Sequence, residues 1–380
     1  MRVIYLANSR IPTHKAHGLE VFKLCEALQK YNNVILILPK RFNNIKKDSF
    51  NYYKIKRKFS IVKITVFDTI IFSFLGKLGF WIEAISFSFF VFLYVLFKTD
   101  DNDIFISHDN APLLAASLLR KNIFYDVHDF PVKGLGFYRI LMRNCLGIIT
   151  TNDLKKNELI KYFFVDPEKI LVYPNGVEIS DFDLALDKSQ AREKLGIPKE
   201  KKIILYAGSF IYWKGVETLV RSASFLGGME LIYLIGGNAR ELENLGLNKD
   251  EIKKVFIIEN RPHEEISLWL RSADVLVLPS TSKYDISKYY TSPMKLFEYM
   301  ASGTPIVASD VPSIKTIVNN ELVSFFMADD AKDLAQIVQF VLKNYQSALL
   351  KAKNAQEEVK KYTWDQRALH IKNFYEKRSN

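Results

Sequence analysis

The carboxylate of Glu298 lies in the segment SPMKLFEYMASGTPIVASD, which runs from Ser292 to Asp310. The pattern predicts a short helix with Ser292 as N-cap and Pro293 at its first position, ended by Gly303 and followed by a buried strand. Glu298 faces partly apolar surroundings on this helix, so its charge is costly unless a partner satisfies it. That partner could be a ligand, a buried backbone amide or a lysine. The free N–H groups at the start of the helix favour a bound anion.

Other polar side chains directly follow apolar runs that are typical of strands. They are His108 and Asp109 after DIFIS, His128 and Asp129 after YDV, Asn175 after LVYP, Ser209 after LYAG, and Ser280 after VLVLP. In open parallel sheets, ligands bind beyond the carboxyl ends of the strands. The repeated pattern therefore predicts binding sites at these edges, although each residue alone is weak evidence.

Strand-like runs alternate with helical patterns along most of the chain, which predicts an α/β fold with parallel sheets covered by helices. The runs are RVIYLA, NVILILP, DIFISH, NIFYDVH, LGIITT, ILVYP, KIILYAG, ELIYLIGG, KVFIIE, DVLVLPS and PIVAS. A length of 380 residues exceeds one ordinary core and indicates two domains. We expect an N-terminal domain over 1–180, a connection with a short helix over 181–202, a C-terminal domain over 203–362, and a last helix within 363–380.

The composition indicates a globular protein of the cytoplasm. The two cysteines, Cys25 and Cys145, lack metal or redox spacing and are typical of reduced core thiols. The start, MRVIYLAN, is a strand pattern without the long apolar region of a signal peptide. The DDND segment at 100–103 has Asp-x-Asp spacing, but it precedes a strand and is more simply a polar turn. We therefore expect no metal and no cofactor.

The chain has 53 Lys and Arg against 42 Asp and Glu, and the excess is concentrated in residues 40–63. Basic residues there are interleaved with Phe and Tyr, and an apolar stretch over 74–98 follows. Its longest uncharged run, 84–97, is too short to span a bilayer. We expect either a buried helix beside a solvated basic face or a peripheral surface that docks on anionic lipid at the inner face of the cell membrane. No nucleic-acid motif accompanies these residues, so no nucleic-acid partner is expected.

Taken together, the motifs resemble the retaining GT-B glycosyltransferases of family 4, the glycosyl transferases group 1. The resemblance rests on YAGSFIYWKGVETLV, SADVLVLPS and SPMKLFEYMASGTPIVASDVPSIKTIV in the second half, and on HGLEVFKLCEAL, YDVHDF and YPNGVE in the first. It implies two Rossmann-like domains, doubly wound and facing across a cleft, with the last helix packing back on the first.

The resemblance also implies an activity. A metal-independent hexosyltransferase would move a sugar, with retention, from a UDP- or GDP-linked nucleotide-sugar donor to a glycan or lipid-linked acceptor. The expected setting is the assembly of cell-surface polysaccharide, lipopolysaccharide or glycolipid. In such transfer the leaving phosphate takes the acceptor proton, so no carboxylate pair of glycosidase type is needed.

Residue roles follow from the same resemblance. His128, Lys214 and Glu298 would be catalytic, with Glu298 on the ribose 2′ and 3′ hydroxyls and Lys214 on the diphosphate. The donor-binding set is Gly18, Gly208, Ser209, Lys214, Tyr290, Ser292, Pro293, Met294, Lys295, Leu296 and Glu298. His17, Glu20 and Asp129 would lie on the acceptor side, with Asp129 orienting the histidine or capping a turn.

Two positions depart from the family pattern. Tyr290 stands where the family often has a first glutamate, and Ser209 stands where an arginine is common. A degenerate GT-B protein that binds glycan or scaffolds a partner is therefore one alternative, and a sugar-nucleotide epimerase of the same fold is another. A nicotinamide-dependent oxidoreductase is disfavoured because no Gly-x-Gly-x-x-Gly follows a predicted strand.

Overall fold

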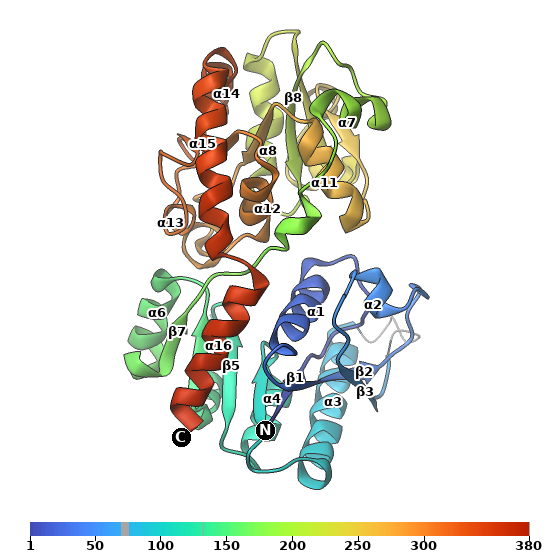
Figure 1. Cartoon of the computed structure of the whole chain (residues 1–380), viewed down its shortest axis with the longest axis vertical. Helices are drawn as coiled ribbons and strands as arrows, with labels where there is room; N and C mark the ends of the chain where they lie inside the picture. Colours follow the sequence, from blue (N-terminus) through green and yellow to red (C-terminus); the bar gives the residue numbers. More distant parts are fainter. Residues whose placement is uncertain (70–75, 132, 380) are drawn as a thin grey trace. The chain divides into compact units, whose positions relative to one another are not determined.

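The computed structural model describes residues 1–69, 76–131 and 133–379, which form two compact units. The first unit comprises Met1–Pro174 and Trp364–Asn380, and the second comprises Asn175–Thr363. Each unit contains one parallel sheet with helices on both faces, as the strand pattern predicted (Figure 1). The segment 181–202, expected as a connection, lies inside the second unit and contributes the helix α7 (Lys188–Leu195).

The first unit contains a seven-stranded sheet in the order β3-β2-β1-β4-β5-β6-β7, with every pair parallel. Its strands are β1 (Arg2–Leu6), β2 (Asn33–Lys40), β3 (Ser60–Thr65), β4 (Ile104–Ser107), β5 (Ile123–Val127), β6 (Gly147–Thr150) and β7 (Ile170–Val172). The strand order reverses between β1 and β4. The carboxyl ends of these two strands therefore form the switch point at which open sheets bind ligands.

Successive side chains of each strand point to opposite faces of this sheet, and helices pack on both faces. Phe105 and Tyr125 belong to a core shared with α3 (Gly76–Lys98), α4 (Asn110–Ser117), α5 (Leu135–Asn144) and α6 (Asp153–Phe163). Phe124, next to Tyr125, points the other way and contacts Phe374 and Tyr375 of α16 (Trp364–Ser379). The last helix thus lies in the first unit, beside α1 (Ala16–Leu28). A short helix, α2 (Ser49–Tyr52), follows β2.

The second unit contains a six-stranded sheet in the order β10-β9-β8-β11-β12-β13, again parallel. Its strands are β8 (Lys202–Ala207), β9 (Glu230–Ile235), β10 (Phe256–Ile258), β11 (Val275–Leu278), β12 (Ile306–Ser309) and β13 (Ser324–Phe326). Here the order reverses between β8 and β11. The segments after these strands contain Gly208, Ser209, Lys214 and Ser280, so the predicted donor motifs meet at a switch point.

Helices cover both faces of the second sheet as well. They are α7, α8 (Val216–Ser222), α9 (Ala239–Asn244), α10 (Lys249–Ile252), α11 (His263–Ser272), α12 (Met294–Ser302), α13 (Pro312–Lys315), α14 (Ala331–Lys343) and α15 (Tyr345–Glu358). One core packs β-strand residues such as Leu205 and Leu276 against α11 and α12, and another packs Ile204 and Val275 against α8 and α14. A single π-helical turn, Ile286–Tyr290, precedes α12.

The apolar stretch expected at 74–98 forms α3, while residues 74 and 75 lie outside the described residues. By length and composition, the Leu78–Lys98 part of α3 could cross a membrane. It is longer than the uncharged run 84–97, which is too short by itself, because the helix continues past the single acid Glu83. The expected buried helix is only partly correct, since 28% of the apolar window is buried.

The basic segment 40–63 is packed more firmly than the sequence suggested. Its aromatic residues Phe50, Tyr53 and Phe59 contact Phe22 of α1 at ring-centroid distances of 4.8 to 5.9 Å. These side chains therefore belong to the core on the α1 side of the first sheet, and the lysines between them extend toward solvent.

Candidate functional site

The helix that carries Glu298 begins one residue later than the sequence predicted. Pro293 is the N-cap of α12 in extended conformation, and no side chain of the described residues caps the helix start. Ser292, the predicted N-cap, instead bonds within the unit: its carbonyl accepts from Asn175 Nδ2 at 3.2 Å. The N-cap residue therefore offers no side-chain acceptor to the first N–H groups of α12, which suits this helix start to an anionic ligand.

The carboxylate of Glu298 is 4% exposed and is paired within its own helix. Lys295 Nζ donates to Glu298 Oε2 at 2.8 Å, so the lysine partner that the sequence offered as an alternative is present in the structure. A buried carboxylate with one ammonium partner keeps further acceptor capacity, because each carboxylate oxygen can accept more than one hydrogen bond. The pair thus explains how the charge is tolerated and leaves room for hydroxyl donors.

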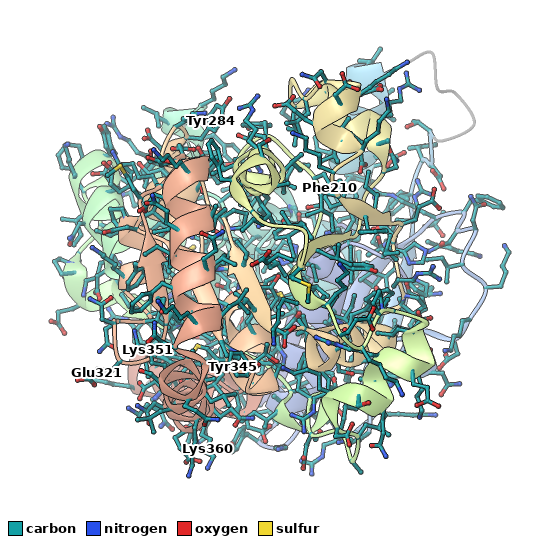
Figure 2. The ribbon with its side chains drawn as sticks, turned by 90° about the horizontal axis from the view of Figure 1, so that it is seen from above. Phe210, Tyr284, Glu321, Tyr345, Lys351 and Lys360 are labelled. Atoms are coloured by element: carbon teal, nitrogen blue, oxygen red, sulfur yellow. The ribbon has the colours of Figure 1, made fainter. Side chains whose placement is uncertain are left out.

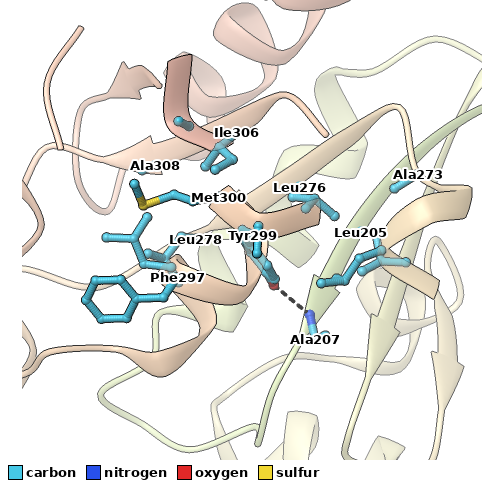
Figure 3. Packing of buried hydrophobic residues seen from close by; sticks show 14 of the residues in the cluster. Leu205, Ala207, Ala273, Leu276, Leu278, Phe297, Tyr299, Met300, Ile306 and Ala308 are labelled. Carbon is cyan, nitrogen blue, oxygen red and sulfur yellow. Dashed lines mark hydrogen bonds between the residues drawn. The ribbon is translucent and has the colours of Figure 1, made fainter. Parts of the chain in front are cut away.

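The neighbouring Tyr299 fixes α12 against the central strand of the sheet. Its hydroxyl oxygen accepts a hydrogen bond from the Ala207 N–H at 2.9 Å (Figure 3). Burial raises the pKa of Tyr299 far above its usual value, and the side chain is fully buried among Leu205, Leu276 and Met300. The contact ties α12 to the last residue of β8, directly before Gly208. Glu298 and the β8 loop are therefore positioned by the same core.

Gly215 holds the loop that carries Lys214 close to the loop after β11. Its φ is +71°, and a Cβ there would lie 2.0 Å from the Pro279 carbonyl oxygen. Only glycine accepts both the left-handed conformation and this contact with backbone. Gly215 also directly precedes α8, so its conformation sets the direction of the preceding residue, Lys214, relative to that helix.

Lys214 carries a charge that no carboxylate of the described residues neutralises. Its Nζ lies 3.8 Å from the centroid of the Trp213 ring, a cation–π contact. Burial, with Lys295 as a second cause, lowers the pKa of Lys214 to about 7. The two ammonium groups thus repel each other beside the start of α12, which is the electrostatic arrangement of an anion site.

The remaining predicted donor residues lie around the same edge. Ser209 is exposed and its carbonyl accepts from the Tyr206 hydroxyl at 3.1 Å, while a Cβ on Gly208 would lie 2.6 Å from that hydroxyl. Tyr290 ends the π-helical turn, an element frequent at functional sites. Figure 2 shows Phe210 and Tyr284 on one side of this unit, away from Tyr345 and Lys360. Exposed aromatic residues such as Tyr284 and its ring neighbour Tyr212 flank the edge.

In the first unit, His128 follows β5 and is held between two carboxylates. Its Nδ1 lies 3.1 Å from Glu20 Oε1 on α1, and its Nε2 lies 3.2 Å from Asp126 Oδ2. Burial disfavours the imidazolium, but both carboxylates favour it, and the pKa of His128 is raised. The predicted partner Asp129 is exposed, so the ring contacts come from Glu20 and Asp126.

Sequence reasoning missed the buried charges beneath this histidine. Asp126 contacts Arg367 of α16, and both side chains are fully buried. Lys155 Nζ donates to the carbonyls of Val127 at 3.0 Å and His128 at 2.6 Å. An acid inside the apolar run NIFYDV was the available signal for Asp126, because a fully buried strand charge requires a partner. Nothing local in the sequence identifies Lys155 or Arg367 as that partner.

The other predicted residues of the first unit lie at the ends of β1, β4 and α1. The His108 ring contacts that of His128 edge-on, with centroids 5.7 Å apart, and burial chiefly lowers the pKa of His17. Gly18 lies in the first turn of α1, where a Cβ would meet the Tyr53 hydroxyl at 2.2 Å. In this structure the small residue therefore makes room for Tyr53.

No group of three or more His, Cys, Asp or Glu that could hold a metal ion is found in the described part of the chain. Each unit has a candidate site of its own. The second unit offers cations, a helix start and a buried carboxylate, which suit a phosphorylated ligand with hydroxyl groups. The first offers an imidazolium between carboxylates, which can exchange hydrogen bonds with a polyhydroxy ligand.

Comparison with known proteins gives a family match and many related folds. Residues 187–362 match the family of glycosyl transferases group 1. Over 237 residues the chain is 28% identical to the uncharacterized glycosyltransferase MJ1607 of Methanocaldococcus jannaschii, which covers 60% of this chain and 59% of that relative. The chain thus spans less than two thirds of the length of this curated relative.

Solved structures match over nearly the whole chain. Sucrose-phosphate synthase from Thermosynechococcus elongatus superposes with a TM-score of 0.77 at 19% identity, covering 99% of both chains. Alr3699/HepE of Anabaena, solved in complex with UDP and glucose, superposes with a TM-score of 0.72 at 16% identity, covering 98% of this chain and 99% of that one. The fold is that of the GT-B glycosyltransferases, and the matches support the group 1 glycosyltransferase family.

Proposed function

We propose, from the group 1 match of residues 187–362, that the protein is a retaining, metal-independent glycosyltransferase of family 4. It would transfer a sugar from a UDP- or GDP-linked donor to a glycan or glycolipid acceptor in the assembly of cell-surface polysaccharide, lipopolysaccharide or glycolipid. The observation that carries the proposal is the juxtaposition of Lys214, Lys295 and the uncapped start of α12 around buried Glu298.

The donor half of the reaction follows from charge. A departing nucleoside diphosphate is stabilised by Lys214 and by the N–H groups at Met294 and Lys295. The ammonium form of Lys214 would be stabilised most by the diphosphate. It has no carboxylate partner in the described chain, and its pKa is lowered to about 7. Glu298 would accept hydrogen bonds from the ribose hydroxyls through the capacity that Lys295 leaves unused. The UDP-bound relative supports a nucleotide-sugar donor.

The acceptor half is proposed for the first unit. Glu20 and His128 would act as one charged pair on the acceptor side, because Glu20 Oε1 lies 3.1 Å from His128 Nδ1. The other carboxylate oxygen of Glu20 would accept a hydrogen bond from a hydroxyl of the sugar or the acceptor. The leaving phosphate would accept the proton of the acceptor hydroxyl, so neither residue needs to act as a glycosidase-type base. Asp126 and Arg367 are positioning residues beneath the ring.

A binding protein without catalysis is the second candidate, favoured by Tyr290 at the position of the missing glutamate. Thermal-shift titrations of the wild type and of Glu298→Ala with UDP, GDP, ADP and their sugar conjugates are the first test of the proposed transferase against its alternatives. A ligand at a hundred times its dissociation constant should add about 2.7 kcal/mol of stability.

Stabilisation by one nucleotide class, lost in Glu298→Ala, followed by transfer to acceptor glycans, would support the enzyme. Nucleotide binding without turnover would favour the degenerate protein, and conversion of the donor without an acceptor would favour an epimerase. If no nucleotide stabilises the wild type, sugar-nucleotide transfer is contradicted. Activity that survives exhaustive treatment with a chelator is expected, and its loss would contradict metal independence.

A further inference from the structure

The outer side of α3 is an exposed apolar stripe. Large side chains recur at helical spacing along it, and each is between 44% and 65% exposed: Leu78, Trp81, Ile85, Phe89 and Leu96. The inner side of the same helix, at Phe87, Val91 and Val95, is completely buried in the core of the first unit. Between Leu78 and Leu96 the stripe extends about 27 Å along the helix. Isolated exposed apolar residues are ordinary, but a continuous row of this length marks an interaction surface.

The stripe continues onto neighbouring helices of the same face. α4 contacts both α3 and α5, and all three share one core. Leu118, directly after α4, is 68% exposed, and Ile140 of α5 is 57% exposed. Figure 1 shows α3 and α4 side by side in the first unit. We call this surface, formed by the outward residues of α3, α4 and α5, the α3–α5 face.

The charges on the α3–α5 face have one sign. In the sequence of the three helices Glu83 is the only acid, and it is engaged by Arg41 and Thr69. The same helices carry cations: Lys98 ends α3, and Arg143 is exposed on α5. Arg139 of α5 is exposed as well, with its guanidinium over the Phe164 ring and donating to the Tyr162 carbonyl at the end of α6. An aromatic and aliphatic surface whose helices also carry cations, with Trp81 among its members, suits the boundary between lipid headgroups and acyl chains.

We propose that the α3–α5 face docks the protein on the surface of an anionic lipid bilayer, with α3 lying in the plane of the membrane. A crossing helix is disfavoured, although the Leu78–Lys98 part is long enough, because crossing would remove Phe87, Val91 and Val95 from the core. Core residues that these side chains cover, such as Phe105 and Leu113, would then be exposed to water, at about 1.5–3 kcal/mol for each fully exposed side chain. The α3–α5 face includes the apolar stretch 74–98 that the sequence indicated as one part of a docking surface, from residue 76 on. It does not include the other part, the basic segment 40–63, whose aromatic residues are packed on α1.

Vesicle flotation of the full chain tests this docking without nucleotide or sugar, so its failure is distinguishable from failure of the proposed transfer activity. The probes are vesicles of phosphatidylcholine alone and of phosphatidylcholine mixed with phosphatidylglycerol. We expect binding to the mixed vesicles, weakened but not abolished by high salt, because apolar insertion is not screened. Ile85→Glu/Phe89→Glu should weaken binding on the order of a hundredfold.

A matched control is available in the second unit. Phe340 and Leu350 are 61% and 62% exposed, close to the 65% and 56% of Ile85 and Phe89. Phe340→Glu/Leu350→Glu therefore removes the same kind of surface and adds the same charge, and it should bind vesicles like the wild type. All four positions are exposed, so melting temperatures should remain unchanged. Arg139→Gln/Arg143→Gln leaves the apolar stripe intact and should weaken binding to the mixed vesicles only. This variant keeps the test decisive if Ile85→Glu/Phe89→Glu misfolds.

Three results would overturn the proposal. They are absence of binding to mixed vesicles, equal losses in the test and control variants, and resistance of the bound protein to alkaline extraction, as a spanning helix would show. If vesicle binding is absent and the chain forms a concentration-dependent dimer that Ile85→Glu/Phe89→Glu abolishes, the α3–α5 face binds a second copy of the chain. Neutralising Lys54, Lys56, Arg57 and Lys58 supplies a further comparison. If that variant alone loses binding, the docking surface is the basic segment and not the α3–α5 face.

Discussion

One guanidinium nitrogen of Arg367, on the last helix, lies 2.9 and 2.7 Å from the two carboxylate oxygens of Asp126, on β5. The two residues are 241 positions apart, and both side chains are fully buried. Arg367 also donates to the carbonyls of Tyr173 and Pro174, where the first passage of the chain through this unit ends. The pair thus joins α16, the end of β7 and the strand that leads to His128.

Breaking this pair should destabilise the first unit strongly. Arg367→Met leaves Asp126 buried without its cation and should lower the free energy of unfolding by about 3–5 kcal/mol, measured by urea denaturation. Lys372→Met is the control, because it removes a partly exposed ion pair with Glu376 on the same helix and should cost less than about 1 kcal/mol. Asp126→Leu/Arg367→Met should recover much of the loss. Equal effects of the two single substitutions would contradict the structural role of the pair.

The charge on His128 should make stability depend on pH. Its pKa is raised above the ordinary value of about 6.5 by Glu20 and Asp126, against the effect of burial. The stabilisation is therefore fully present below about pH 6.5 and is lost as the pH rises through the folded-state pKa. The difference in free energy of unfolding between wild type and His128→Gln should shrink over that interval. Glu20→Gln should move the histidine titration, followed by NMR, to lower pH, and a constant difference at all pH values would refute the pairing.

Donor affinity should weaken in alkaline solution. The Lys214 pKa of about 7 means that the unliganded protein loses this charge as the pH rises through neutrality. A bound diphosphate favours the ammonium, so above about pH 7 the affinity should fall up to tenfold per pH unit. Calorimetric titration with a nucleotide sugar measures this, because its diphosphate diester has no group that titrates near neutrality. Lys214→Arg keeps its charge and should give a flat profile. A flat wild-type profile would place the diphosphate elsewhere.

Discrimination of ribose should depend on Glu298. If its carboxylate accepts a hydrogen bond from the 2′ hydroxyl, the wild type should bind the 2′-deoxy form of its nucleotide about ten- to a hundredfold more weakly, the range for a charged hydrogen bond of about 1.5–3 kcal/mol. Glu298→Gln should discriminate much less between the two nucleotides. Lys295→Met removes the ion pair and leaves the Glu298 carboxylate in place. If Glu298 serves only this ion pair, the wild type does not discriminate between the nucleotide and its 2′-deoxy form.

Gly215 should be required for the geometry of the Lys214 loop. Gly215→Ala combines a φ of +71° with a Cβ 2.0 Å from a backbone oxygen, so it should both destabilise the second unit and reduce nucleotide binding. Gly196→Ala is a matched control, because its φ is +66° and no atom lies within 4 Å of the added Cβ. The control should cost about 1–2 kcal/mol of strain and leave binding intact. Thermal denaturation and nucleotide titration of both variants distinguish the two effects.

The amino-acid sequence by itself determined most of the strand framework and the place of the motifs. Eleven apolar runs correspond to strands, because strands buried on both faces are continuously hydrophobic. β3 and β13 were missed. Both are edge strands: β3 alternates apolar residues with Lys63, and β13 has only three residues. Local patterns also placed Lys214 in the segment after β8 and Glu298 on a short helix, because turns and helix starts depend on neighbouring residues. The roles of these two residues followed only from the family resemblance.

The tertiary structure decided which charges meet. Asp126 pairs with Arg367, and Lys155 binds the carbonyls beside His128, although nothing local in the sequence relates Arg367 or Lys155 to the histidine. The Lys295–Glu298 pair, in contrast, is three residues apart on one helix and could be expected from the sequence. The tertiary structure also decided that α3 buries only one side, while its composition is apolar all round. Local propensity depends on neighbouring residues in the chain, whereas the cost of a buried charge or an exposed apolar row depends on what the folded chain places against it.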